Sequence, residues 1–284
     1  MSKTMTLGEH VSELKRRVMR ILIVVLGITA FVFFFSIQRI QINETQNLLL
    51  PIPNPFNNIA SLIIHKIVDD VAPDFVQLIV TAPGQAILSE LLIAVFCGLI
   101  FAMPVIAYEL GSFVSPGLHD NERSTIIRLI TPITLLFVAG STFAYYLVIP
   151  FAVDFLYTYA QELGALAFIT VPELISFVVM FLVGFGLSFQ LPVIMWLLTF
   201  LGLVEPSFWK ENLRIAIVVI IIFGAIITPD GSGVTMWLVA LPMLGLYIAG
   251  FLYIQKTVWN LVYDCSSNFN PMLIATGEQY PRFK

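Results

Sequence analysis

Charged residues are scarce in this chain of 284 residues: Asp, Glu, Lys and Arg make up 11% of it, whereas 58% is hydrophobic. A soluble domain has about 25% charged and about 45–50% apolar residues. The composition therefore excludes an ordinary soluble domain and indicates an integral membrane protein. Basic residues form no patch beyond one short N-terminal cluster, so nothing indicates a nucleic-acid partner.

Cysteines and catalytic motifs are also few or missing. Cys97 and Cys265 form neither a CxxC pair nor a disulfide framework, and His10, His65 and His119 lie in separate polar segments. We therefore expect no metal site and no cofactor. The chain has no H-E-x-x-H, no nucleophile elbow and no phosphate-binding G-x-x-x-x-G-K-[ST], so we expect no enzyme. Any work must then use binding energy or the transmembrane field.

Six apolar runs are candidates to cross a hydrocarbon core of about 30 Å, which takes about 20 helical residues. The predicted spans are Val18–Ser36, Ala86–Leu110, Ile126–Ile149, Glu173–Leu201, Leu213–Thr228 and Val234–Phe251. The last two are short, so they require local thinning of the bilayer or burial among neighbours. A breaker cluster between them, residues 229–233, predicts a tight turn and an antiparallel pair.

Prolines recur inside the predicted spans, and each removes one backbone hydrogen bond and bends its helix. They are Pro104, Pro132, Pro192 and Pro242. We predict an all-α membrane protein whose six transmembrane helices, several of them short or bent at proline, form a curved wall.

Lysine and arginine divide unevenly between the two sides of these spans. Only Arg39 and Lys66 fall on one side, and the other twelve of the fourteen fall on the side of both termini. The positive-inside rule then predicts an N-in/C-in, multi-pass protein of the cell membrane with both termini in the cytoplasm. We expect a cytoplasmic segment 1–17, a transmembrane domain 18–253 and a cytoplasmic tail 254–284.

The two longer external loops each contain a run with helical character. In the first loop, the amphipathic run Ile59–Val71 predicts a short helix lying on the outer surface. In the second loop, Phe151–Glu162 is expected to be helical as well. No internal repeat is visible in the sequence, which argues against the many secondary transporters that are built from repeats.

Polar side chains are rare within the spans. Glu90 and Glu109 lie near the two ends of the second span, where they can reach water, and Gln190 is the one large polar side chain deep in a span. Two interpretations of Gln190 stay open: a hydrogen bond between neighbouring helices, or a polar contact for an inserting partner.

Two carboxylates interrupt the most basic side of the protein. Glu13 lies in an amphipathic half-helix and can pair with Arg17 at a spacing of four residues. Glu122 lies in the polar break after Phe113, which a Pro116–Gly117 turn makes rigid. A carboxylate on a rigid loop just outside the membrane is a docking point for a cationic ligand.

Four motifs resemble one family. His10-Val-Ser-Glu-Leu-Lys-Arg-Arg17 resembles the motif H-x-x-E-L-R-x-R of TatC, the multi-spanning subunit of the twin-arginine (Sec-independent) protein translocase. The stretch Phe113–Arg123 resembles that family's F-x-x-P-x-L-x-x-x-E-R. Phe185-Gly-Leu-Ser-Phe-Gln-Leu-Pro192 resembles F-G-x-x-F-E/Q-x-P, and Thr228-Pro-Asp230 resembles its T-P-P-D turn. The resemblance extends from Gly8 to about Tyr253.

The resemblance implies a receptor and core scaffold that exports folded proteins with the proton-motive force, and it supplies site residues. Signal-peptide binding would fall to Glu13, Lys15, Arg17, Phe113, Pro116, Glu122 and Arg123. Gln190 and Pro192 would meet a single-span partner, and Pro55, Pro229 and Asp230 would be structural.

The implied partners are twin-arginine signal peptides, single-span subunits of the TatA/TatB type, the lipid bilayer and further copies of the chain. The chain departs from the family pattern at Lys15, where arginine is usual, at Gln190, where a carboxylate is frequent, and at the turn, which has one proline fewer. The alternative function is a small-solute secondary transporter, which would need charged residues converging at mid-membrane. An intramembrane protease lacks every catalytic motif.

Overall fold

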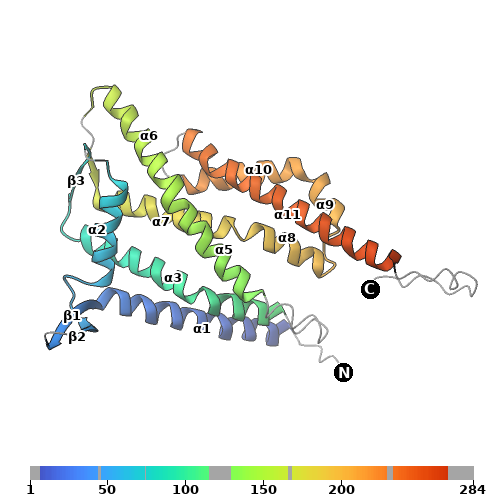
Figure 1. Cartoon of the computed structure of the whole chain (residues 1–284), viewed down its shortest axis with the longest axis horizontal. Helices are drawn as coiled ribbons and strands as arrows, with labels where there is room; N and C mark the ends of the chain where they lie inside the picture. Colours follow the sequence, from blue (N-terminus) through green and yellow to red (C-terminus); the bar gives the residue numbers. More distant parts are fainter. Residues whose placement is uncertain are drawn as a thin grey trace, which may run out of the picture.

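The computed structural model describes residues 7–43, 46–73, 75–114, 129–165, 168–228 and 233–267. Its long helices run alongside one another (Figure 1). They are α1 (Leu7–Phe34), α3 (Gln85–Val114), the continuous run α5 (Ile130–Phe143), η2 (Ala144–Val148) and α6 (Ile149–Glu162), then α7 (Val171–Ser188), α8 (Leu191–Phe200), α10 (Leu213–Ile227) and α11 (Gly233–Ser267).

The helical layer has two different ends. Helix α1 begins and α11 ends at the same end, which also holds the short helix α9 (Pro206–Glu211) and the last turns of α3 (Figure 1). We call this the terminal end. The opposite, cap end holds α2 (Ile59–Val71) and four strands, β1 (Phe35–Asn43), β2 (Gln46–Pro53), β3 (Gln77–Ile79) and β4 (Phe168–Thr170).

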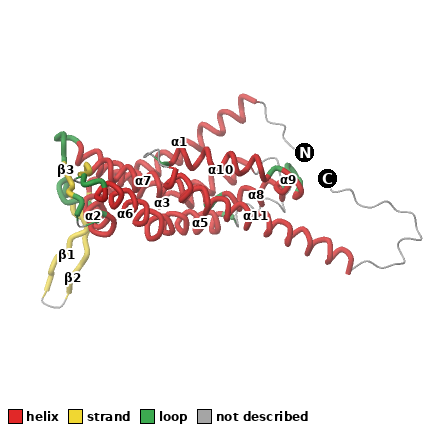
Figure 2. The backbone as a smooth tube through the Cα atoms, turned by 90° about the horizontal axis from the view of Figure 1, so that it is seen from above, coloured by secondary structure: helices red, strands yellow, loops and turns green. Residues whose placement is uncertain are grey.

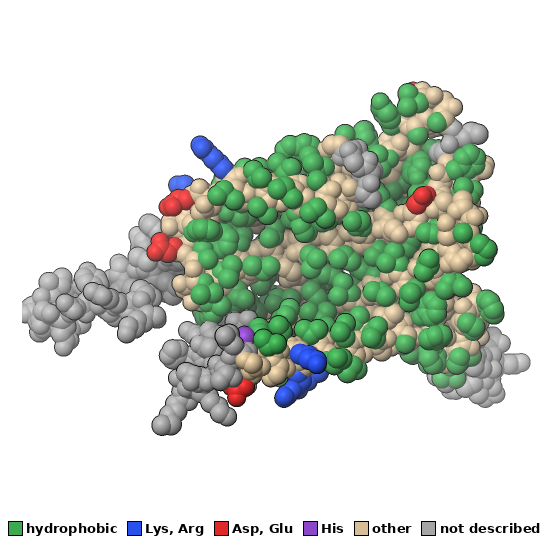
Figure 3. Space-filling model, turned by 180° about the vertical axis from the view of Figure 1, so that it is seen from behind, with side chains coloured by type: hydrophobic (Ala, Val, Ile, Leu, Met, Phe, Trp, Pro, Cys, Tyr) green, Lys and Arg blue, Asp and Glu red, His purple; other side chains and the backbone are tan. Residues whose placement is uncertain are grey.

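The surface between the two ends is apolar. Within the described ranges, five helical segments are long and apolar enough to span a membrane, and α10, with 15 residues, is a shorter sixth. Large apolar side chains face outward there, as Ile23 and Ile226 do with exposed fractions of 64% and 66%. Figure 3 shows this apolar band, with most charged side chains of that face lying toward the terminal end. The predicted fold of six membrane-crossing helices is confirmed.

The third predicted span is longer than expected. The run Phe151–Glu162 is helical as predicted, but it is not a separate helix of the loop, because α5, η2 and α6 form one helix that continues to Glu162. The π-helix η2 explains why Pro150 does not end it. The Ile149 N–H donates to the Ala144 carbonyl, five residues back. The wider turn relieves the clash that a proline ring normally makes with the preceding turn.

The fourth predicted span, Glu173–Leu201, is two helices rather than one. Helix α7 ends at Ser188, and α8 starts at Leu191 after a tight turn in which the Gln190 N–H donates to the Leu187 carbonyl. Pro192 has no N–H to give to the carbonyl of Ser188, which removes the bond that would have continued α7. The Ser188 hydroxyl donates back to the Gly184 carbonyl at 2.6 Å, within the last turn of α7.

The other prolines act differently from one another. Pro104 and Pro242 lie inside α3 and α11, as predicted. Pro132, in contrast, lies in the first turn of α5, where a missing N–H costs no helical hydrogen bond. Helix α11 continues to Ser267, well beyond the predicted end of the sixth span at Phe251.

The cap end contains structure that the sequence analysis missed. Strands β1 and β2 form an antiparallel hairpin that projects from the molecule (Figure 2), and β3 and β4 pair in parallel. The predicted helix Ile59–Val71 is confirmed as α2. Asn58 caps it, because its Oδ1 accepts the N–H of Ser61 at 2.7 Å.

Glycine brings the main helices close together. A Cβ at Gly98 of α3 would lie 2.5 Å from the Thr29 Oγ1 and 2.8 Å from the Val25 carbonyl oxygen of α1. A Cβ at Gly140 of α5 would lie 2.6 Å from the Phe185 carbonyl oxygen of α7. These approaches fix α1 against α3 and α5 against α7, and the first of them positions the site described next.

Candidate functional site: a charged cluster between α1 and α3

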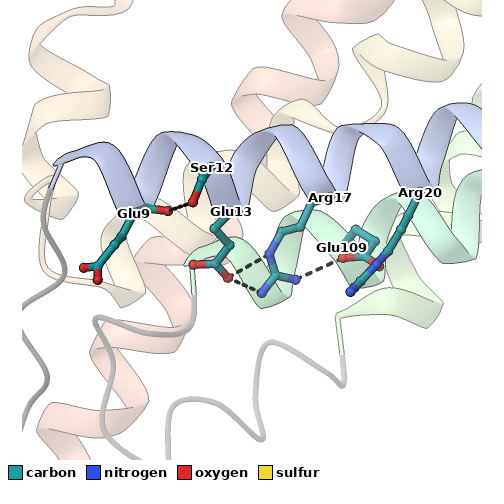
Figure 4. Close-up of polar contacts among 6 residues, drawn as sticks. All are labelled: Glu9, Ser12, Glu13, Arg17, Arg20 and Glu109. Carbon is teal, nitrogen blue, oxygen red and sulfur yellow. Dashed lines mark hydrogen bonds and ion pairs between the residues drawn. The ribbon is translucent and has the colours of Figure 1, made fainter.

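Four charged side chains meet at the terminal end, where α1 lies along α3. Glu13, Arg17 and Arg20 follow one another at spacings of four and three residues, which places them on one face of α1. Glu109 faces them from the next-to-last turn of α3 (Figure 4). We call Glu13, Arg17, Arg20 and Glu109 the α1–α3 cluster.

Arg17 bridges the two carboxylates of this cluster. Its Nε donates to the Glu13 Oε1 at 3.0 Å and its Nη2 donates to the same oxygen, while its Nη1 donates to the Glu109 Oε2 at 3.0 Å. The Nη1 of Arg20 donates to the other oxygen of Glu109 at 3.1 Å. The cluster therefore joins a local pair within α1 to a contact between two helices.

Burial differs sharply within the cluster. The side chain of Glu109 is 6% exposed, those of Glu13 and Arg17 are 20% and 17% exposed, and that of Arg20 is 56% exposed. A buried carboxylate is tolerated when it is paired and hydrogen-bonded, and both oxygens of Glu109 are. The Oε2 of Glu13 is buried, yet none of the described residues donates a hydrogen bond to it.

An aromatic contact joins the first two of the four family motifs of the sequence. The ring of Phe113, at the end of α3, stacks on His10 of α1 with centroids 4.5 Å apart. The chain leaves α3 directly after this contact, toward the stretch that carries Pro116, Glu122 and Arg123. Those three predicted residues lie outside the described ranges. The structure thus brings Glu13, Arg17 and Phe113 together near the end of α3, where that stretch begins.

Lys15 does not belong to the cluster. It is exposed and lies on the part of α1 that turns away from Glu13 and Arg17, and Arg16 is exposed as well. Lys15 is therefore available to solvent or a ligand on the outer surface of the terminal end.

Gln190 lies in the break between α7 and α8 and is 8% exposed. Its Nε2 donates to the Ile133 carbonyl of α5 at 3.0 Å, which is the interhelical hydrogen bond of the first interpretation. Its Oε1 is buried and accepts no hydrogen bond from any described residue. Pro192, two residues on, packs near Gly250 of α11, where an added Cβ would lie 3.1 Å from the Pro192 Cα.

The remaining predicted residues are at the cap end or outside the described ranges. Pro55 lies in the loop before α2, next to Asn54, whose Oδ1 accepts the N–H groups of Phe56 and Asn57. Pro229 and Asp230 fall between α10 and α11, in residues that lie outside the described part of the chain.

The cap end has polar contacts of its own. The Nδ2 of the fully buried Asn58 donates to the Glu90 Oε2 at 2.8 Å. The Tyr145 hydroxyl, on η2, donates to the Asp70 Oδ2 at 2.6 Å, and Lys66 pairs with the same carboxylate at 3.2 Å. These bonds tie α2 to α3 and η2. Among the described residues, no group of three His, Cys, Asp or Glu could hold a metal ion.

Glu109 and Arg20 are the functional candidates that sequence reasoning missed. Glu109 was expected to reach water at the end of its span, but it is buried against α1. The available signal was a carboxylate at the terminal end of one span and a surplus of arginines at the same end of another.

Known proteins of one family resemble this chain in sequence. The family model for Sec-independent protein translocase protein (TatC) matches residues 9–242. The TatC protein of Cenarchaeum symbiosum is 40% identical over 252 residues, which cover 89% of this chain and 95% of that protein. TatCy of Bacillus subtilis is 33% identical over 250 residues, which cover 86% of each chain.

A crystal structure of the twin-arginine translocase receptor TatC has the same fold. It superimposes with a TM-score of 0.72 at 28% identity, over 88% of this chain and 100% of that one. The family is a component of a protein translocase, which decides for protein translocation over small-solute transport and assigns a non-enzymatic role. This multi-pass membrane protein belongs to the TatC family of Sec-independent protein translocases.

Proposed function

We propose that this protein is the receptor of its translocase for signal peptides with two adjacent arginines, and the core scaffold on which folded cargo is exported with the proton-motive force. The observation that carries the proposal is the buried Oε2 of Glu13, which accepts no hydrogen bond from the described residues, one turn along α1 from the His10 that stacks on Phe113. Glu13 and Phe113 lie near the end of α3, where the stretch that carries Glu122 begins. A pair of arginines needs two carboxylates, and Glu13 and Glu122 are the pair that we propose.

The chemistry of the site favours arginine over lysine. A guanidinium is a planar fork that matches a carboxylate, whereas an ammonium is a point charge. Hydrogen bonds to charged groups contribute about 1.5–3 kcal/mol each, so the loss of one weakens binding about tenfold or more. Lys15, Arg17 and Arg123 are proposed as the basic members of the site.

The orientation that this function requires follows from charge. Lys15, Arg16, Arg17, Arg20, Lys210, Arg214 and Lys256 all lie toward the terminal end. By the positive-inside rule, that end faces the cytoplasm of a cell membrane, where cargo is made.

Gln190 is proposed as the contact for a single-span subunit of the TatA/TatB type within an oligomeric complex. Its buried Oε1 has no donor among the described residues, and a membrane-buried acceptor is stabilised by a hydrogen bond from a neighbouring helix. Gln190→Leu is expected to reduce co-purification of the single-span subunit while Gln190→Glu retains it.

Site-specific photocrosslinking tests the receptor role. A crosslinker at position 122 is expected to capture a twin-arginine signal peptide and not its twin-lysine version. Glu122→Gln is expected to weaken binding of the twin-arginine peptide about tenfold or more, with the protein still folded in the membrane. Equal capture of both peptides, or unchanged binding to the variant, would refute the proposal.

A further inference from the structure

The four charges of the α1–α3 cluster neutralise one another. Two carboxylates, Glu13 and Glu109, face two guanidiniums, Arg17 and Arg20. An arriving cation therefore meets no net negative charge from these residues. It can bind Glu13 strongly only if it takes over contacts that an internal cation already makes.

Arg17 makes those contacts in the way that an arginine of a ligand would. Two of its N–H groups, from Nε and Nη2, converge on the Glu13 Oε1, while the Oε2 of Glu13 accepts nothing from the described residues. The carboxylate is thus half occupied by a guanidinium of the protein itself. Because that oxygen is also buried, a ligand guanidinium gains Glu13 only by displacing the contacts that now cover the carboxylate.

The other end of the Arg17 guanidinium is already held elsewhere. Its Nη1 donates to the Glu109 Oε2 at 3.0 Å, and Glu109 is the most buried member of the cluster. If Arg17 leaves Glu13, it keeps a carboxylate partner and is not left as an unpaired buried charge. Glu109 therefore makes the displacement of Arg17 from Glu13 possible at low cost.

We propose that Arg17 is an internal occupant of the arginine-binding site and that it sets the preference for arginine over lysine, with Glu109 receiving it when a ligand binds. This inference rests on the proposed receptor function. An incoming arginine replaces both N–H donors that Arg17 withdraws from Glu13. A lysine offers a single charged nitrogen, cannot restore the two-donor contact, and is excluded by the competition.

The test is the ratio of two affinities, measured with the full chain in lipid nanodiscs. Binding of fluorescently labelled twin-arginine and twin-lysine signal peptides is titrated for wild type, Arg17→Gln and Arg17→Lys. With the internal competitor removed or reduced to a point charge, the preference for the arginine peptide is expected to fall about threefold or more. A purely structural role of Arg17 would weaken both peptides alike and leave the ratio unchanged.

Arg16→Gln is the matched control, since it removes the same charge one residue away from an exposed position outside the cluster. It should keep the wild-type ratio. Glu109→Gln removes the carboxylate that receives Arg17, and is expected to weaken both peptides about fivefold or more with the ratio retained.

The outcomes distinguish a failure of the receptor function from a failure of the proposed role of Arg17. A wild-type protein that binds both peptides equally contradicts the receptor function itself. A wild-type preference that persists unchanged in Arg17→Gln and Arg17→Lys overturns the inference and leaves the receptor function standing. If Arg17→Gln fails to fold, as judged by its thermal midpoint, the ratio in Arg17→Lys decides.

Discussion

The two ends of the helical layer both carry hydrogen-bonded carboxylates, but they use them differently. At the cap end, Glu90 accepts a hydrogen bond from Asn58, which also caps α2, and Asp70 is shared by Tyr145 and Lys66. These bonds hold α2 against its neighbours. At the terminal end, Glu13 keeps a buried oxygen without a donor among the described residues, and Arg17 bridges two competing carboxylates.

This difference separates a framework from the proposed binding site. Polar groups that are fully satisfied rigidify a fold, whereas a partly satisfied group is costly and persists where it has a use. Substitutions of polar residues at the cap end should therefore lower stability and leave ligand binding unchanged. Substitutions in the α1–α3 cluster at the terminal end should weaken ligand binding and change stability less.

The largest expected effect on stability comes from Asn58→Ala at the cap end. It removes the cap of α2 and the amide that pairs with Glu90, which together stabilise by about 3 kcal/mol. The thermal midpoint of the purified protein should fall clearly, while twin-arginine peptide binding at low temperature stays as in wild type. Asn57→Ala, an exposed neighbour, is the control and should change neither. Loss of peptide binding in folded Asn58→Ala would break the comparison.

A somewhat smaller loss of stability is expected from Gly98→Ala, and this substitution should also weaken peptide binding. The new Cβ would clash with backbone and side chain of α1, and such overpacking costs about 1–3 kcal/mol. Because α1 must shift, Glu109 should also lose its alignment with Arg17, so that peptide binding weakens along with stability.

Gly27→Ala is the matched control on α1, since a Cβ added there would have no neighbouring atom within 4 Å. It should leave both stability and binding near wild type. Wild-type binding in Gly98→Ala would show that the α1–α3 contact does not position the cluster.

The smallest effect is a pH dependence at the cap end. Hydrogen bonds from the Tyr145 hydroxyl and from Lys66 hold the pKa of Asp70 below its ordinary value. A lowered pKa gives stability that is present above the unfolded-state pKa, about 3.9, and is lost as pH falls through the folded pKa. The difference in thermal midpoint between wild type and Asp70→Asn should therefore shrink as the pH falls from about 6 to about 3.

Asp69→Asn is the control for this titration, because Asp69 is exposed and adjacent. Its difference from wild type should not vary with pH in the same way. A pH-independent difference for Asp70→Asn would mean that the contacts of Asp70 with Tyr145 and Lys66 do not favour its ionised form in the folded protein.

The sequence predicted the parts of the fold that depend on local composition. Apolar runs located six membrane-crossing helices, and amphipathic spacing predicted α2 with its observed bounds, Ile59–Val71. The bounds of the helices differed from the prediction where a backbone detail decides. The π-helix η2 carries a helix past Pro150, and the missing N–H of Pro192 divides the fourth span. The short strands of the cap depend on pairing partners distant in sequence, as β3 and β4 show.

For the site as well, the sequence predicted the local contact and not the contact between helices. A spacing of four residues gave the pair Glu13–Arg17, which the structure contains. The partner across the helices, Glu109, lies 92 residues from Arg17, and no local pattern connects them. Only the packing of α1 on α3 shows that one guanidinium bridges both carboxylates.

The same chemical change made at both ends tests the central claim most directly. Glu13→Gln and Glu90→Gln each replace a carboxylate by an amide, one at the terminal end and one at the cap end. Affinity for a labelled twin-arginine signal peptide is measured for both variants in nanodiscs. Our account predicts about tenfold or more weaker binding for Glu13→Gln and binding within about twofold of wild type for Glu90→Gln. Unchanged binding in Glu13→Gln, or an equal loss in both variants, would contradict it.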